Sequence, residues 1–78
     1  MNKFFKYERI RDLREDGGIL QRDVAQYLGI TQNLYSYYER GDRKMPIEFY
    51  AKLARYYGTS VDYLLGETDE RKPYPRAK

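Results

Sequence analysis

Apolar residues recur along this chain at intervals of three and four positions, in short segments that each end at a glycine. Such spacing places apolar side chains on one face of a helix, and glycine commonly follows a helix because it adopts a left-handed backbone conformation at little cost. The pattern predicts five short helices, at about residues 3–16, 21–28, 32–40, 46–57 and 61–65. Because no segment alternates apolar and polar residues as a strand would, the sequence predicts an all-α fold.

Residues at the expected helix ends support these boundaries. Thr31 and Ser60 precede the third and fifth helices, where a hydroxyl can accept a hydrogen bond from an amide of the first turn. Pro46 suits the first position of the fourth helix, because its backbone φ is already close to the helical value. The expected buried face of that fourth helix consists of Ile47, Tyr50, Leu53, Ala54 and Tyr57.

The last twelve residues differ from the rest of the chain. The segment "ETDERKPYPRAK" is charged, contains two prolines and has few side chains to bury. Such a composition favours disorder. The sequence therefore predicts one domain over residues 1–66 and a charged, disordered tail over residues 67–78.

The third predicted helix has two faces of different character. Tyr35 and Tyr38 lie three positions apart on the side that Ile30 leads into, and we expect them to face the core. The other side carries amide, hydroxyl and phenol groups, which can contact adenine, other base edges or phosphates. These residues are Gln32, Asn33, Ser36 and Tyr37. On helix geometry alone, a polar face in contact with water is the alternative.

A short connection around Gly29 joins the second and third predicted helices. A turn of three or four residues makes two helices cross steeply, so that the second one projects from the body of the domain. The major groove of B-DNA is about 12 Å wide and admits one α-helix. The pattern therefore predicts a helix-turn-helix unit over residues 21–41.

The segment "LQRDVAQYLGITQNLYSYYERGDRKMP", with "LARYYGTSVDYLLG" after it, resembles the Xre-type helix-turn-helix domain of phage repressor and Cro proteins. The resemblance covers about residues 10–66, and glycines, an alanine, a serine, a glutamate and a proline stand at the family's offsets. It implies the five-helix, lambda-repressor-like fold. It also implies a cytoplasmic transcriptional repressor that binds double-stranded DNA as a homodimer, on a pseudo-palindrome with half-sites about 34–36 Å apart.

The resemblance also implies roles for individual residues. The positions that match base-reading residues are Gln32, Asn33, Ser36 and Tyr37. The positions that match phosphate-binding residues are Gln21, Arg22, Thr31, Arg40, Arg43 and Lys44. Dimer contacts are implied for Val61, Tyr63 and Leu64, although we expect Val61 and Leu64 to be mostly core residues, which leaves Tyr63 as the better candidate.

A further implied feature is an ion pair between Arg14 and Glu39. An unpaired glutamate on the recognition helix would repel DNA, whereas a pair with Arg14 would neutralise the charge and fix the angle of the helix. The alternative is an exposed ion pair, which contributes about 0–1 kcal/mol.

The chain departs from the family pattern in two respects. Leu20 stands where the family usually has a threonine that caps the second helix, and a missing cap costs about 0.5–2 kcal/mol. Asp23 in the first turn offsets part of that cost through the helix dipole. Tyrosines also stand where the family usually has aliphatic residues, and a buried tyrosine needs a partner for its hydroxyl. They are Tyr35, Tyr38, Tyr50 and Tyr57.

Composition adds weaker constraints. The net charge is +3 and the pI is about 9.2, which fits either ordinary solubility or a polyanionic partner. The chain has no histidine or cysteine, no phosphate-binding loop and no metal-ligand spacing, so we expect neither an enzyme nor a cofactor. No segment reaches the roughly 20 apolar residues that span a bilayer. An antitoxin, or a protein-interaction module with the same fold, is the alternative function.

Overall fold

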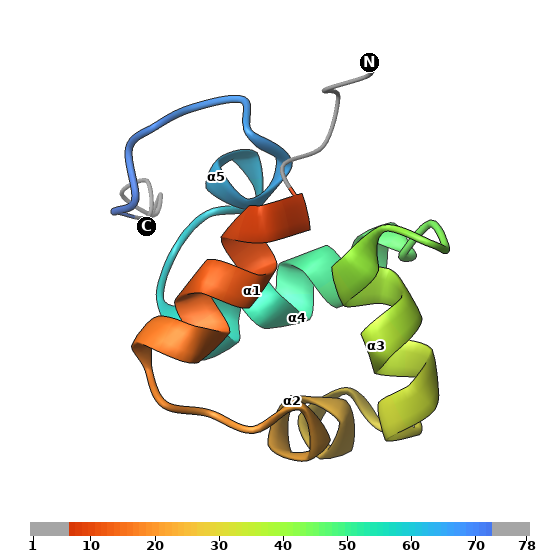
Figure 1. The fold of residues 1–78 in the computed structure, drawn as a ribbon. Helices are drawn as coiled ribbons and strands as arrows, with labels where there is room; N and C mark the ends of the chain where they lie inside the picture. The colour runs from red at the N-terminus through yellow and green to blue at the C-terminus, as the bar shows by residue number, and fades with distance from the viewer. Residues whose placement is uncertain (1–6, 73–78) are drawn as a thin grey trace.

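The computed structural model describes residues 7–72, and this part of the chain forms five α-helices and no strand (Figure 1). The helices are α1 (Tyr7–Asp16), α2 (Gln21–Leu28), α3 (Gln32–Arg40), α4 (Ile47–Tyr57) and α5 (Val61–Leu65). The predicted all-α fold is therefore confirmed. The expected start of the first helix, near residue 3, lies outside the described residues.

The turn between α2 and α3 is fixed by local hydrogen bonds. Gly29 has a φ of 77°, which favours glycine, and the amide of Ile30 donates to the carbonyl of Ala25 at 3.0 Å. Thr31 then caps α3, since its hydroxyl accepts a hydrogen bond from the amide of Leu34 at 3.1 Å. The turn closes α2 and starts α3 within three residues, so the two helices pack against each other at a steep angle.

One hydrophobic core joins all five helices. Its largest fully buried side chain is Tyr35, and the tyrosines at positions 38 and 50 are also buried. The aliphatic members are Ile10, Leu13, Val24, Ala25, Leu28, Met45, Leu53, Ala54 and Leu64. The predicted inward face of α3 is thus confirmed. The hydroxyl of Tyr57 is buried, and within residues 7–72 it has no hydrogen-bond partner.

The start of α4 differs from the sequence prediction. Pro46 is the residue before the helix rather than its first residue, which is within the ordinary uncertainty of a helix boundary. Ile47 was expected in the core, but 63% of its surface is exposed, so that prediction is wrong. Met45 is buried and fills the core at this end, which leaves Ile47 outside it, whereas Phe49 packs against the core and Tyr50 belongs to it.

The segment after α5 also differs from expectation. Residues 67–72 loop back past α5 and are bound by Arg9 of α1 and by Thr59, instead of leaving the domain (Figure 1). The guanidinium of Arg9 donates to the carbonyls of Tyr63 at 2.8 Å and Thr68 at 2.6 Å, and to Asp69 Oδ1 at 2.6 Å. The hydroxyl of Thr59 donates to the carbonyl of Arg71 at 2.6 Å. The rest of the expected tail, residues 73–78, lies outside the described residues.

Candidate nucleic-acid interface

The outer face of α3 is polar and accessible. Gln32 and Asn33 in its first turn are exposed, and Tyr37 keeps 40% of its surface exposed. Ser36 is half-buried between them. Figure 1 shows α3 at one side of the molecule. The side chains that the sequence assigned to base reading therefore lie on one continuous surface.

Two arginines meet the C-terminal half of this face. Arg40 Nη1 donates to Ser36 Oγ at 2.6 Å, and Arg40 Nε donates to Asp42 Oδ2 at 2.9 Å. The guanidinium carbon of Arg40 lies 5.0 Å from the centre of the Tyr37 ring, and that of Arg43 lies 5.3 Å from it. Both distances fit cation–π contacts. We call these five residues, Ser36, Tyr37, Arg40, Asp42 and Arg43, the outer cluster.

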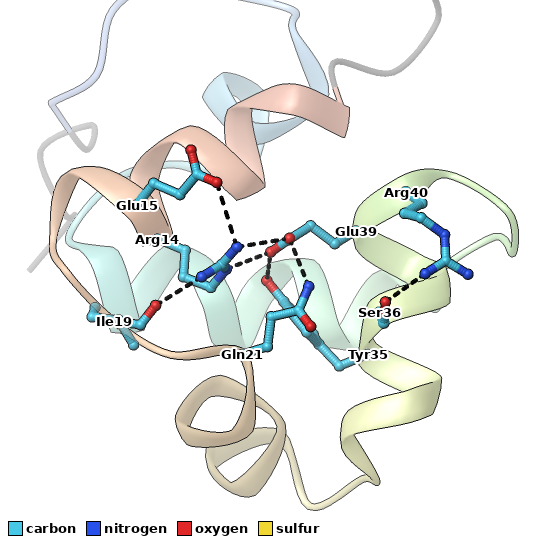
Figure 2. A network of polar contacts seen from close by, with 8 residues as sticks. All are labelled: Arg14, Glu15, Ile19, Gln21, Tyr35, Ser36, Glu39 and Arg40. Carbon is cyan, nitrogen blue, oxygen red and sulfur yellow. Dashed lines mark hydrogen bonds and ion pairs between the residues drawn. The ribbon is translucent and has the colours of Figure 1, made fainter.

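The inner side of α3 is fixed by a buried polar network around Glu39 (Figure 2). Arg14 donates twice to this carboxylate, from Nε to Oε2 at 2.7 Å and from Nη2 to Oε1 at 3.0 Å. The hydroxyl of Tyr35 donates to Oε2 at 2.6 Å, and Nε2 of Gln21 donates to Oε1 at 3.0 Å. The remaining bond from Arg14 runs to the carbonyl of Ile19 at 2.9 Å. The network therefore ties α1 and α2 to α3.

Burial and hydrogen bonding act in opposite directions on Glu39. Burial disfavours the charged carboxylate and would raise its pKa, but the hydrogen bonds from Arg14, Tyr35 and Gln21 outweigh that effect and hold the pKa below its ordinary value. The hydrogen bond to Glu39 raises the pKa of Arg14. Burial, together with the bond to Glu39, raises the pKa of Tyr35. At neutral pH the network thus holds an ionised pair and a neutral phenol.

The predicted ion pair between Arg14 and Glu39 is present, and it is not a surface pair. The side chains of Arg14 and Glu39 are only 13% and 4% exposed. Sequence reasoning missed that Tyr35 and Gln21 also bind Glu39. The spacing of Tyr35 and Glu39, four residues apart on one helix, was the available signal for the first of these contacts.

Apart from Arg40, which belongs to the outer cluster, the residues assigned to phosphate binding fall into two groups. Gln21 is half-buried and its amide nitrogen is used by Glu39, and the Thr31 hydroxyl caps α3. In contrast, Arg22 is exposed on α2, and Arg43 and Lys44 are exposed in the loop after α3. The helix-turn-helix unit thus offers cations at the start of α2 and at the end of α3, on either side of the polar face.

One of the residues assigned to a dimer contact is a core residue. Leu64 is 1% exposed, because it faces inward from α5. Its expected core role is therefore confirmed, and its possible dimer contact is withdrawn. Val61 and Tyr63 are partly buried. The ring of Tyr63 lies beneath the Arg9 guanidinium, whose central carbon is 4.0 Å from the ring centre.

Two further residues were not anticipated from the sequence, namely Asp42 in the outer cluster and Arg9 beside α5. Their partners depend on side-chain rotamers or on chain segments 60 residues away, which helical periodicity does not predict. Within residues 7–72, no three side chains of the histidine, cysteine, aspartate or glutamate type gather as a metal site would require. In the same range, every helix is too short or too polar to span a bilayer.

Comparisons with known proteins agree with this geometry. A helix-turn-helix family model matches residues 10–64. Among curated relatives, the HTH-type transcriptional regulator YobD of Bacillus subtilis is 38% identical over 66 residues, which cover 85% of this chain and 59% of YobD. The transcriptional repressor RstR of the cryptic phage CTXphi of Vibrio cholerae is 34% identical over 61 residues, which cover 78% of this chain and 55% of RstR.

A solved structure has the same arrangement of helices. The crystal structure of a transcriptional regulator from Listeria innocua aligns with a TM-score of 0.77 and 28% sequence identity, over 85% of this chain and 63% of that one. The chain spans only 59% and 55% of the lengths of the two curated relatives above. The residues that the family model matches, 10–64, include both helices of the unit and the positions of Arg14, Gln21, Tyr35 and Glu39. The chain therefore belongs to the Xre-like helix-turn-helix family.

Proposed function

We propose that this protein is a sequence-specific double-stranded DNA-binding regulator of transcription, and that it places α3 in the major groove. The observation that carries the proposal is the division of α3 into a rigidly held inner face and an exposed polar outer face. A helix that reads base edges needs both properties, because its side chains must meet the bases at a fixed angle. On this proposal the protein binds DNA and is not an enzyme.

Base reading on this proposal comes from Gln32, Asn33 and Tyr37, since amides can pair with adenine and the phenol can meet a base or a phosphate. Affinity comes from cations at both ends of the polar face, namely Arg22, Arg43 and Lys44. The start of α2 contributes backbone amides, which suit a phosphate. The amide of Gln21 gives one of its two N–H donors to Glu39, so we assign it mainly to positioning α2, with the second donor left for a phosphate.

A homodimer on a pseudo-palindromic operator fits the small size of the reading surface. One recognition helix covers only a few base pairs, and two-fold symmetric proteins of this type place two helices about one DNA turn apart. Val61 and Tyr63 on α5 are the residues we propose for the contact between copies. We propose that the protein acts as a repressor in the cytoplasm, and the repressor role agrees with the name of the related transcriptional repressor RstR.

The test is selection of bound duplexes from a random pool, followed by measurement of how many chains bind the selected duplex. We expect a two-fold symmetric sequence whose half-sites lie about 10 base pairs apart, bound by two chains. Affinity for it should fall steeply with salt, because phosphate contacts release counterions. If no sequence is enriched even at low salt, the proposal fails and the same fold is better explained as an antitoxin or protein-interaction module.

A further inference from the structure

Arg40 is the member of the outer cluster whose position is most tightly defined. Its Nη1 reaches back one helical turn to Ser36 Oγ at 2.6 Å, so the guanidinium lies along the outer face of α3 (Figure 2). Side chains on a helix lean towards its N-terminus, which makes this direction natural for a residue four positions after Ser36. The head group therefore lies beside the residues proposed to read bases.

Three contacts hold the Arg40 side chain in place. Besides Ser36, Asp42 Oδ2 accepts a hydrogen bond from Nε at 2.9 Å, and the Tyr37 ring lies 5.0 Å from the guanidinium carbon. An arginine free in solution has many rotamers, and it loses that freedom when it binds. Because these contacts already restrict the Arg40 side chain, it loses little further conformational entropy when it binds a base.

The donors that remain on Arg40 suit one base. A guanidinium has five N–H donors, and the contacts to Asp42 and Ser36 use one on Nε and one on Nη1. Three N–H donors remain, one on Nη1 and two on Nη2. One donor from each of these nitrogens can point in the same direction. Guanine presents two adjacent acceptors, O6 and N7, in the major groove, and arginine binds them in this bidentate manner.

The charge of Asp42 argues against a phosphate as the partner of Arg40. A carboxylate 2.9 Å from Nε would repel a phosphate held by the same guanidinium, whereas a base edge carries no net charge. By contrast, none of the ion pairs within residues 7–72 involves Arg43 or Lys44. These two cations are the better phosphate ligands.

We propose that Arg40 is a specificity-determining residue that reads a guanine through O6 and N7, and that Asp42 and Ser36 position it. This inference rests on the proposed function, and it replaces the sequence-based expectation that Arg40 binds a phosphate. Ser36 then acts mainly through Arg40, because its oxygen already accepts a hydrogen bond from Nη1.

The first experiment compares duplex selection by the full chain with selection by Arg40→Ala and Arg40→Lys. We expect both variants to lose the preference for G·C at one position of each half-site. For Arg40→Ala, the affinity for the sequence that the wild type selects should fall about 5- to 150-fold. The affinity for a duplex in which that G·C pair is exchanged should change little. Arg40→Lys keeps the charge but cannot donate in a bidentate manner, so its preference should also be lost.

Lys44→Ala is the matched control, since Lys44 is an exposed cation of the same loop. It should weaken binding to both duplexes by the same factor. Asp42→Asn gives a second readout. If Asp42 positions Arg40, the ratio of affinities for the two duplexes falls in this variant. If Asp42 acts only through its charge, its removal raises both affinities and leaves the ratio unchanged.

The outcomes separate this inference from the proposed function. A wild-type chain that selects no sequence overturns both. A wild-type chain that selects a sequence, combined with an Arg40→Ala variant that keeps the same consensus and binds all duplexes more weakly, overturns only the role of Arg40. Circular dichroism of each variant checks the fold, which should not change, because Arg40 and Asp42 are 54% and 55% exposed.

Discussion

At the scale of single residues, the carboxylate of Glu39 is the most constrained group in the domain. Each of its two oxygens accepts two hydrogen bonds, and the donors come from three helices or their ends. A buried charge is tolerated only when its partners compensate for the loss of water. Glu39 therefore stabilises the domain only as long as the whole set of partners is present.

Removal of the carboxylate should consequently be costly. We expect Glu39→Ala to lower the free energy of unfolding by about 3–5 kcal/mol, because it leaves Arg14 buried without its counter-ion. A core of this size supplies only about 3–5 kcal/mol, so the variant should be largely unfolded at 25 °C. Urea denaturation followed by circular dichroism measures the change. Asp42→Ala, which breaks an exposed pair, is the control and should cost no more than about 1 kcal/mol.

The same group predicts how stability depends on pH. The folded state lowers the pKa of Glu39 below its ordinary value of 4.5, so the unfolded chain binds a proton at higher pH than the folded one. The stabilisation is therefore complete above that value and is lost as the pH falls below it. Urea midpoints measured from neutral pH down to about pH 3 should show a steeper acid loss in the wild type than in Glu39→Gln. Equal slopes would contradict this assignment.

At the scale of elements, α2 begins without a side-chain cap, as α4 does after Pro46. α3 and α5 are capped by the hydroxyls of Thr31 and Ser60, whereas Leu20 precedes α2 with an extended backbone and no side-chain hydrogen bond. Leu20 is also 51% exposed, so its side chain contributes little to the core. The sequence identified this weakness correctly, because capping depends on one local position.

A cap introduced at this position should stabilise the domain. The backbone of Leu20, with φ −81° and ψ 151°, already has the conformation of an N-cap residue. We expect Leu20→Thr to raise the free energy of unfolding by about 1 kcal/mol, which corresponds to a rise in Tm of about 4–8 °C. Leu20→Ala, which lacks the oxygen, is the control. A Tm for Leu20→Thr no higher than that of Leu20→Ala would count against the capping account.

The sequence predicted the helices themselves well and their ends less well. Periodicity placed Tyr35 and Tyr38 in the core and Tyr37 outside, because the three-residue repeat fixes which side chains share a face. It failed for Ile47, since the same repeat continues to the first residue of α4, which lies past the core. Periodicity along one helix does not report where the neighbouring helices stop.

At the scale of the whole molecule, the segment after α5 shows a second limit of sequence reasoning. Its charged composition suggested disorder, yet Arg9 binds backbone carbonyls and a carboxylate up to 60 residues away. Hydrophobic patterns do not report such polar contacts between distant parts of a chain. The role of Asp42 escaped detection for a related reason, because it depends on the direction in which the Arg40 side chain points.

The contacts of Arg9 predict a local change on mutation. Arg9→Ala should release residues 67–72 while the helices remain folded, because hydrogen bonds to a charged group contribute about 1.5–3 kcal/mol. Trypsin cleavage after Arg71 should then become at least about tenfold faster. Arg11→Ala, an exposed change on the same helix, is the control and should leave the rate unchanged. Equal cleavage of Arg9→Ala and wild type would show that Arg9 does not hold the segment.

The two faces of α3 have a consequence for how such a domain changes over generations. Arg14, Gln21, Tyr35 and Glu39 depend on one another, so a change at one of them requires a change at another. Gln32, Asn33 and Tyr37 touch none of these four through a hydrogen bond within residues 7–72. The exposed set can thus vary freely while the buried set stays fixed, which would let descendants of one stable scaffold acquire new targets without passing through unfolded intermediates.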